Sequence, residues 1–202
     1  MLHKAKLTES ERMIIFGTLL GGSLIGLVAS AVLSYEAIVL ARESTAVLSC
    51  DLNAIVSCGT VGRHASSYIF GFPNSFIGMV AMPVFITIAV AGLARTQFPR
   101  WFMKAAEGGA VVSLLFAAWM LYMSLSVIGA LCPWCLTTDL GVLLIVFALI
   151  RYNASTDNLC IKGSAATRLK AVVRKNYDVV VLISVIVLVV ATILAKYGSQ
   201  LF

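Results

Sequence analysis

The chain has 202 residues, of which 60% are hydrophobic and 12% are charged, and its mean hydropathy is +0.99. Such a composition excludes an ordinary water-soluble domain and is typical of a protein that crosses a membrane several times. The formal net charge of +6 is carried by loops, as the order of the segments shows.

Segments of about 20 apolar residues are long enough to span the hydrocarbon core of a membrane. The sequence contains five candidates, at 14–33, 76–94, 110–131, 135–150 and 179–195. The first is longer than a usual signal-peptide core and lacks a clear Ala-x-Ala site behind it, so we expect it to be retained. The fourth is short unless its helix begins at Cys132. The predicted fold class is an all-α integral membrane protein forming one compact bundle.

The Lys and Arg residues predict the orientation. In a five-span topology, 12 of the 15 fall on one side and only Arg42, Arg63 and Lys196 fall on the other. Because cytoplasmic loops carry the excess of Lys and Arg, we expect a cytoplasmic N-terminus at 1–13. The same bias accounts for the basic loop at 151–178. We therefore infer neither nucleic-acid nor anionic-lipid binding from this loop, and expect membrane lipid to surround the spans.

Four cysteines then lie on the exoplasmic side in two pairs, while Cys160 is cytoplasmic. Disulfides persist in oxidising compartments and not in a reducing cytosol, so both pairs lie where they could cycle. Cysteine pairs that meet can pass two electrons by thiol–disulfide exchange. The arrangement indicates redox chemistry at a membrane surface.

The pair Cys132 and Cys135 stands in the sequence Cys-Pro-Trp-Cys. This spacing at a helix start brings two sulfurs within disulfide range, and a helix N-terminus favours a thiolate. Pro133 suits a first helical turn because its missing N–H is not needed there. An unreactive buried pair and half of a metal site are the alternatives. His3 and His64 do not supply the other ligands of a metal site, so we expect no metal.

Cys50 and Cys58 are eight residues apart in an outer loop at 34–75. A continuous helix would hold their sulfurs about 12 Å apart at a rise of about 1.5 Å per residue, so a disulfide requires the chain to bend. A loop that bends can also open and pass electrons to the other pair. The alternative is a permanent structural disulfide.

The order of three motifs resembles the vitamin K epoxide reductase family, and most closely its bacterial branch. The motifs are a Cys-x7-Cys loop after the first span, Pro-Asn-Ser-Phe-Ile-Gly at the second, and Cys-Pro-Trp-Cys-Leu-Thr-Thr at the fourth. The resemblance covers 14–150 and implies a four-helix catalytic bundle around a quinone, menaquinone or ubiquinone. Residues 179–202 would add a fifth spanning helix and a short exoplasmic tail. The implied location is the bacterial plasma membrane.

By that resemblance, Cys132 and Cys135 are the active-site pair, and Cys135 passes electrons to the quinone. Cys50 and Cys58 are the shuttle pair that receives electrons from a thioredoxin-fold protein. Asn74 matches the family residue that donates a hydrogen bond to a quinone carbonyl, although Asn also suits a helix N-cap. The family's loop hydroxyl corresponds to Ser66 or Ser67.

Two features depart from the family pattern. Asp139 stands where vertebrate relatives carry a Tyr, which argues against vitamin K epoxide as the substrate. An acid at this depth suits a proton relay beside the quinone or a place near the interface. Some bacterial relatives continue into a fused thioredoxin-like domain, whereas this chain stops at Phe202. We therefore expect a DsbA-like partner in trans. Vitamin K epoxide reduction and a metal-binding membrane protein remain the alternative functions.

Overall fold

The computed structural model describes residues 7–156, 158, 171–173 and 175–201. Within these residues, five helices are long and apolar enough to cross a membrane. They are α1 (Glu9–Arg42), α3 (Ser75–Leu93), α4 (Arg100–Met123), α5 (Pro133–Ser155) and α7 (Tyr177–Leu201). The predicted all-α membrane fold is confirmed. Cys160 and most of the predicted basic loop lie outside the described residues.

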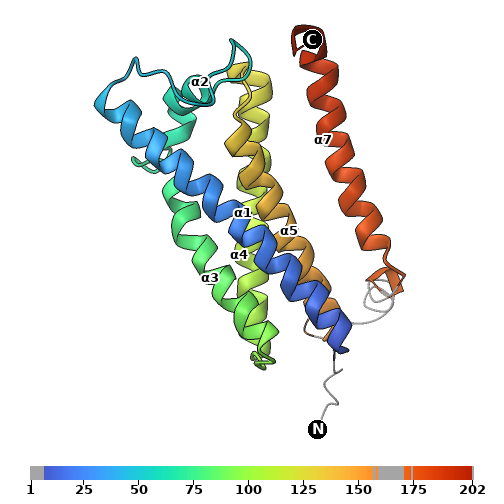
Figure 1. Ribbon diagram of the computed structural model, residues 1–202. Helices are drawn as coiled ribbons and strands as arrows, with labels where there is room; N and C mark the ends of the chain where they lie inside the picture. The colour runs from blue at the N-terminus through green and yellow to red at the C-terminus, as the bar shows by residue number, and fades with distance from the viewer. Residues whose placement is uncertain (1–6, 157, 159–170, 174, 202) are drawn as a thin grey trace.

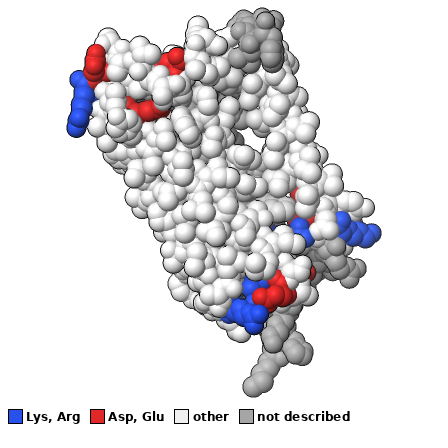
Figure 2. Space-filling model, in the orientation of Figure 1, with Lys and Arg blue, Asp and Glu red and all other residues white. Residues whose placement is uncertain are grey.

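In the described part of the chain, α1, α3, α4 and α5 form a bundle, and α7 stands beside it (Figure 1). α1 packs along both α3 and α5, while α4 packs on α5. On the face shown in Figure 2, charged side chains gather toward the two ends and leave an uncharged band between them. This is the pattern that a lipid bilayer demands, since a charge in the hydrocarbon core is costly.

α1 continues well beyond the predicted span of 14–33. It begins with a capping box, in which Thr8 and Glu11 bond each other's backbone N–H groups, and it ends at Arg42. The first part of the predicted outer loop, 34–42, is therefore helical, and the loop begins at Glu43. Hydropathy marks only the part of a helix that lies in lipid. The more polar last turns of α1 still form their backbone hydrogen bonds within the helix, so the helix can continue past the membrane surface.

α1 and α5 cross at glycines. A Cβ atom on Gly22 would lie 2.8 Å from the backbone oxygen of Gly141, and one on Gly141 would lie 2.7 Å from the oxygen of Gly22. Only glycine at both positions permits this approach. Close backbone contact through small residues is how helices associate in a membrane, where lipid competes equally for apolar side chains.

The chain between α1 and α3 folds over one end of the bundle, here called the loop end (Figure 1). It contains α2 (Cys58–Arg63) and a 3-10 turn, Ala65–Tyr68. A parallel bridge between Val56 and Leu131 ties this chain to the segment before α5. In that bridge the N–H of Ser57 donates to the oxygen of Leu131 at 2.9 Å.

α7 is held to the bundle near its two ends. Arg151 of α5 forms a salt bridge of 3.0 Å with Asp178, and both side chains are 12% exposed. Toward the other end, Lys196 and Tyr197 donate to the backbone oxygen of Leu125. Leu125 lies in the π-helical turn Ser124–Ile128 that follows α4. Such turns leave carbonyl groups without a regular helical donor, which these side chains supply.

Candidate redox site

Cys132 and Cys135 lie at the start of α5, as the sequence predicted. Cys132 is the N-cap, Pro133 occupies the first turn, and the backbone N–H of Cys135 donates to the sulfur of Cys132 at 3.2 Å. Both cysteines are free thiols, with Cys132 buried and Cys135 half-buried. The sulfur of Cys132 thus takes the place of an N-cap oxygen and faces a backbone donor. We call these residues the helix pair.

Cys50 and Cys58, here called the loop pair, form a disulfide with their Cα atoms 5.7 Å apart. The chain bends between them, as a disulfide at this spacing requires. Asn53 makes the bend, because its side-chain oxygen accepts from the N–H groups of Ile55 and Val56 at 2.9 and 2.7 Å. Such a bond from Asn to the backbone two residues on is typical of turns.

Asp51 holds the loop pair in place. Its carboxylate accepts hydrogen bonds from the loop, namely Leu48 N–H at 2.9 Å, Ser57 Oγ at 2.8 Å and Gly59 N–H at 2.8 Å. Burial opposes ionisation of Asp51, but these hydrogen bonds and the charge of Arg63 outweigh it and lower the pKa of Asp51 below its ordinary value. Arg63 also donates to the backbone oxygens of Ser44 and Ala46. The charged carboxylate therefore joins the two sides of the bend.

A cavity of about 320 Å³ lies between the bundle helices and the loop. Most of its lining side chains are apolar, which suits the ring of a lipid-soluble ligand. The predicted site residues that line it are Cys58, Asn74, Cys132, Cys135 and Asp139. Cys50 does not line the cavity. The structure therefore brings every predicted site residue except Cys50 to one chamber, and Cys50 is bonded to a residue of that chamber.

Asn74 occupies the N-cap position of α3, but its side chain makes no capping hydrogen bond. The alternative role as a side-chain cap is therefore wrong. Its amide nitrogen instead donates to the backbone oxygen of Ser66 at 2.7 Å and lies 3.8 Å from the sulfur of Met120. Because the Ser66 oxygen only accepts, it fixes the orientation of the amide. The second amide hydrogen then faces a weak acceptor at the cavity wall.

Two further expectations concern hydroxyl and acid groups. Of the two candidate loop serines, Ser67 lines the cavity, and its hydroxyl donates to the oxygen of Val61 at 2.7 Å. Ser66 does not line it. Asp139 lies four residues after Cys135 on α5, so both side chains occupy the same helix face. The structure thus places an acid one helical turn beyond the half-buried thiol of the helix pair.

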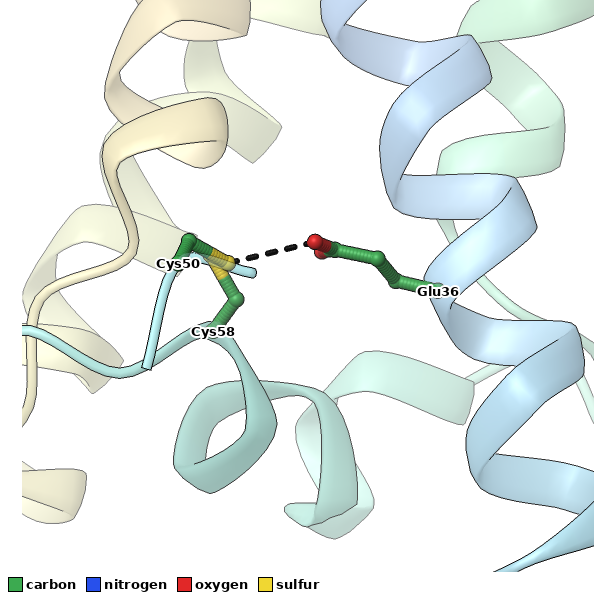
Figure 3. Close-up of side chains that lie close together, drawn as sticks. All are labelled: Glu36, Cys50 and Cys58. Atoms are coloured by element: carbon green, nitrogen blue, oxygen red, sulfur yellow. Dashed lines mark hydrogen bonds between the residues drawn. A yellow bond between two sulfur atoms is a disulfide. The ribbon is translucent and has the colours of Figure 1, made fainter. Parts of the chain in front are cut away.

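Two residues of the site, Asp51 and Glu36, were not among those predicted from the sequence. The carboxyl group of Glu36 points from α1 at the loop disulfide, with Oε1 at 3.2 Å from the sulfur of Cys50 (Figure 3). An acid three residues past the apolar segment 14–33 was a usable signal, because an acid so near a span often has a function. Glu36 was missed because we assigned its position to the outer loop.

Glu36, Cys50 and Cys58 place potential metal ligands within 4.8 Å of one another. The two sulfurs are bonded to each other, and a disulfide sulfur is not a thiolate ligand. The donor set in this oxidation state is therefore one carboxyl group, which does not make a metal site.

The model of the vitamin K epoxide reductase family matches residues 18–150, about two thirds of the chain. The matched range begins within α1 and ends within α5, so it includes both cysteine pairs and every residue of the chamber identified above. A search of curated proteins found no significant match.

Proposed function

Because this chain belongs to the vitamin K epoxide reductase family, a family of membrane redox enzymes, we propose that it oxidises the dithiol of a DsbA-like thioredoxin-fold partner. The electrons pass through the loop pair and the helix pair to a membrane quinone. The observation that carries the proposal is the shared cavity. Cys58 of the loop pair and both members of the helix pair line one apolar chamber.

The geometry favours one order of transfer. Cys58 lines the chamber with the helix pair, whereas Cys50 does not. The bridge between Val56 and Leu131 runs parallel, so the residues that follow it, Cys58 and Cys132, leave it in the same direction. In this order a partner thiolate attacks Cys50 and breaks the loop disulfide, and the electron pair leaves on Cys58.

The released Cys58 thiolate attacks Cys132 in an oxidised helix pair and forms a mixed disulfide. The bond between Cys132 and Cys135 breaks, and its electron pair leaves on Cys135, in the chamber. The partner's second thiol then displaces Cys50 from the mixed disulfide, and the partner leaves as an oxidised protein. Cys50 attacks Cys58, restores the loop disulfide and releases Cys132. Two electrons have then moved from the partner to the helix pair.

A bound quinone supplies a two-electron, two-proton acceptor. The chamber suits it in size and polarity, since pockets for small ligands begin near 300 Å³ and are mostly apolar. Asn74 presents an amide N–H that now faces only the sulfur of Met120, a weak acceptor that a carbonyl oxygen would replace. Asp139 exchanges a proton one turn from Cys135.

We place the loop end on the exoplasmic side of a bacterial plasma membrane. Among the described residues, Lys and Arg concentrate at the opposite end of the helices, in accord with positive-inside bias. The loop pair is a disulfide, which an oxidising compartment maintains. Reoxidised partner molecules would there introduce disulfides into exported proteins.

The test is quinone reduction by the purified protein in detergent, followed by quinone absorbance, with a reduced DsbA-like protein as the electron donor. We expect turnover by the unchanged protein, loss of turnover in Cys135→Ser, and unchanged turnover in the control Cys160→Ser. Turnover by Cys135→Ser, or none with either menaquinone or ubiquinone analogues, would overturn the proposal. Fast turnover of vitamin K epoxide with dithiothreitol would instead support epoxide reduction.

A further inference from the structure

Glu36 is a buried acid in contact with the loop disulfide. Its side chain is 5% exposed and lines the chamber, and its Oε1 lies 3.2 Å from the sulfur of Cys50 and 3.4 Å from the hydroxyl of Ser49. The other carboxyl oxygen has no hydrogen-bond partner, and no salt bridge joins Glu36 to Lys or Arg within the described residues. Neither oxygen is therefore neutralised by a cation.

The contact with Cys50 bears on the protonation of Glu36. A disulfide sulfur carries no hydrogen, so Cys50 cannot donate to Glu36 in this oxidation state. Burial of a carboxylate without a cation is costly, and such a group takes up a proton instead. Glu36 is then the neutral acid. Its hydrogen is within reach of the Cys50 sulfur, which must accept a proton when the mixed disulfide between Cys50 and the partner opens.

The charged and titratable neighbours favour the same state. Asp51 of the loop remains ionised because its hydrogen bonds and Arg63 hold its charge. Its negative charge disfavours a second one on Glu36. The helix pair and Asp139 of α5 share the chamber and add only acidic groups. Burial and the negative charge of Asp51 thus both oppose an isolated carboxylate at Glu36.

We propose that Glu36 is the general acid and base of exchange at Cys50, an inference that rests on the proposed thiol–disulfide relay. When a partner cysteine displaces Cys50, the bond to Cys50 breaks, and the electron pair stays on its sulfur. The proton of Glu36 moves to that sulfur, leaving a thiol and a carboxylate. When Cys50 attacks to restore the loop disulfide, the carboxylate takes the proton back. Glu36 gains and loses no electrons.

The proposal is tested on the loop pair alone. The background protein carries Cys132→Ser and Cys135→Ser, so it reacts with neither quinone nor the helix pair, and serine preserves the helix cap. Dithiothreitol reduces the loop disulfide, and a maleimide gel shift follows the two thiols between pH 5 and 9. Each rate is divided by the thiolate fraction of dithiothreitol. The outcome is independent of the partner and of quinone turnover, which are measured separately.

Glu36→Gln keeps the shape of the side chain but has no exchangeable acid proton. We expect its corrected rate to be lower by about 10²-fold, the usual contribution of general acid catalysis, and to be independent of pH. The background protein should instead lose rate as rising pH removes the proton. The control is Glu43→Gln, an exposed acid just after α1, which should leave rate and slope unchanged.

Glu36→Asp is the second variant. Its carboxyl group is one methylene shorter and falls short of Cys50, so we expect a rate at least about tenfold lower that still declines with pH. A role in packing alone would not separate the two pH profiles. If Glu36→Gln keeps the slope, or if either variant reacts at the rate of Glu43→Gln, the proposal is overturned.

Discussion

Replacing Asp51 by Asn should make the loop disulfide easier to reduce. One carboxylate oxygen of Asp51 accepts from Ser57 and Gly59, and the other accepts from the N–H of Leu48 at 2.9 Å. An asparagine retains one accepting oxygen but turns its amide hydrogens toward Leu48. Two donors then face each other where a hydrogen bond had joined the two sides of the bend.

The size of the change in redox potential follows from the Leu48 N–H, which loses its acceptor. A buried donor without an acceptor costs about 1–3 kcal/mol, and we take about 2 kcal/mol here. Since about 30 mV corresponds to about 1.4 kcal/mol for a two-electron couple, the midpoint potential of the loop pair should rise by about 40 mV. This value is an upper bound, because any part of the Asp51 network that persists in the reduced loop does not contribute.

The assay is a redox titration of the loop pair in the Cys132→Ser and Cys135→Ser background. The protein is equilibrated with mixtures of reduced and oxidised dithiothreitol, and its thiols are then trapped by alkylation. Glu43→Gln removes the same charge from an exposed position and serves as the control. A midpoint for Asp51→Asn equal to that of the control would refute the role of Asp51 in holding the cysteines together.

The same residue predicts an acid limit. The pKa of Asp51 is lowered in the folded loop, so its contribution to loop stability is complete above the ordinary aspartate pKa of about 3.9. It is lost as the pH falls through the lowered pKa of the folded state. The contribution of Asp51 to loop stability should therefore be constant from neutral pH to about pH 5 and fall below about pH 4. Asp51→Asn should lack this acid step in the same titration.

Two other substitutions test the chamber and the bundle. Asn74→Ala removes the amide donor and its bond to Ser66, and we expect kcat/KM for quinone to fall about 10²-fold in the absorbance assay. An unchanged value would exclude Asn74 from the site. Gly22→Ala should lower the free energy of unfolding in detergent by about 1–3 kcal/mol, because its Cβ would meet the backbone of Gly141. The control Gly21→Ala, whose Cβ would have nothing within 4 Å, should not lower the free energy of unfolding. Equal melting temperatures for the two variants would contradict this packing.

The sequence by itself determined the membrane class, the five spans and the helix that begins at the helix pair. Transfer of a side chain into lipid is a local property that adds along a segment, so hydropathy predicts spans without knowledge of their neighbours. The signal for the first turn of α5 was equally local, because Cys132 and Pro133 suit the N-cap and the first helical position. The family resemblance rested on the order of such local motifs.

Only the tertiary structure decided which side chains meet. Hydropathy gave no reason for α1 to continue to Arg42, yet that extension carries Glu36 to the sulfur of Cys50, 14 residues away in the chain. Asn74 likewise suited a helix cap by local rules, yet its side chain makes no capping bond, and its amide nitrogen donates to the backbone oxygen of Ser66. These contacts depend on how the loop folds over the bundle. That fold is set by hydrogen bonds and packing between distant segments, which no local pattern records.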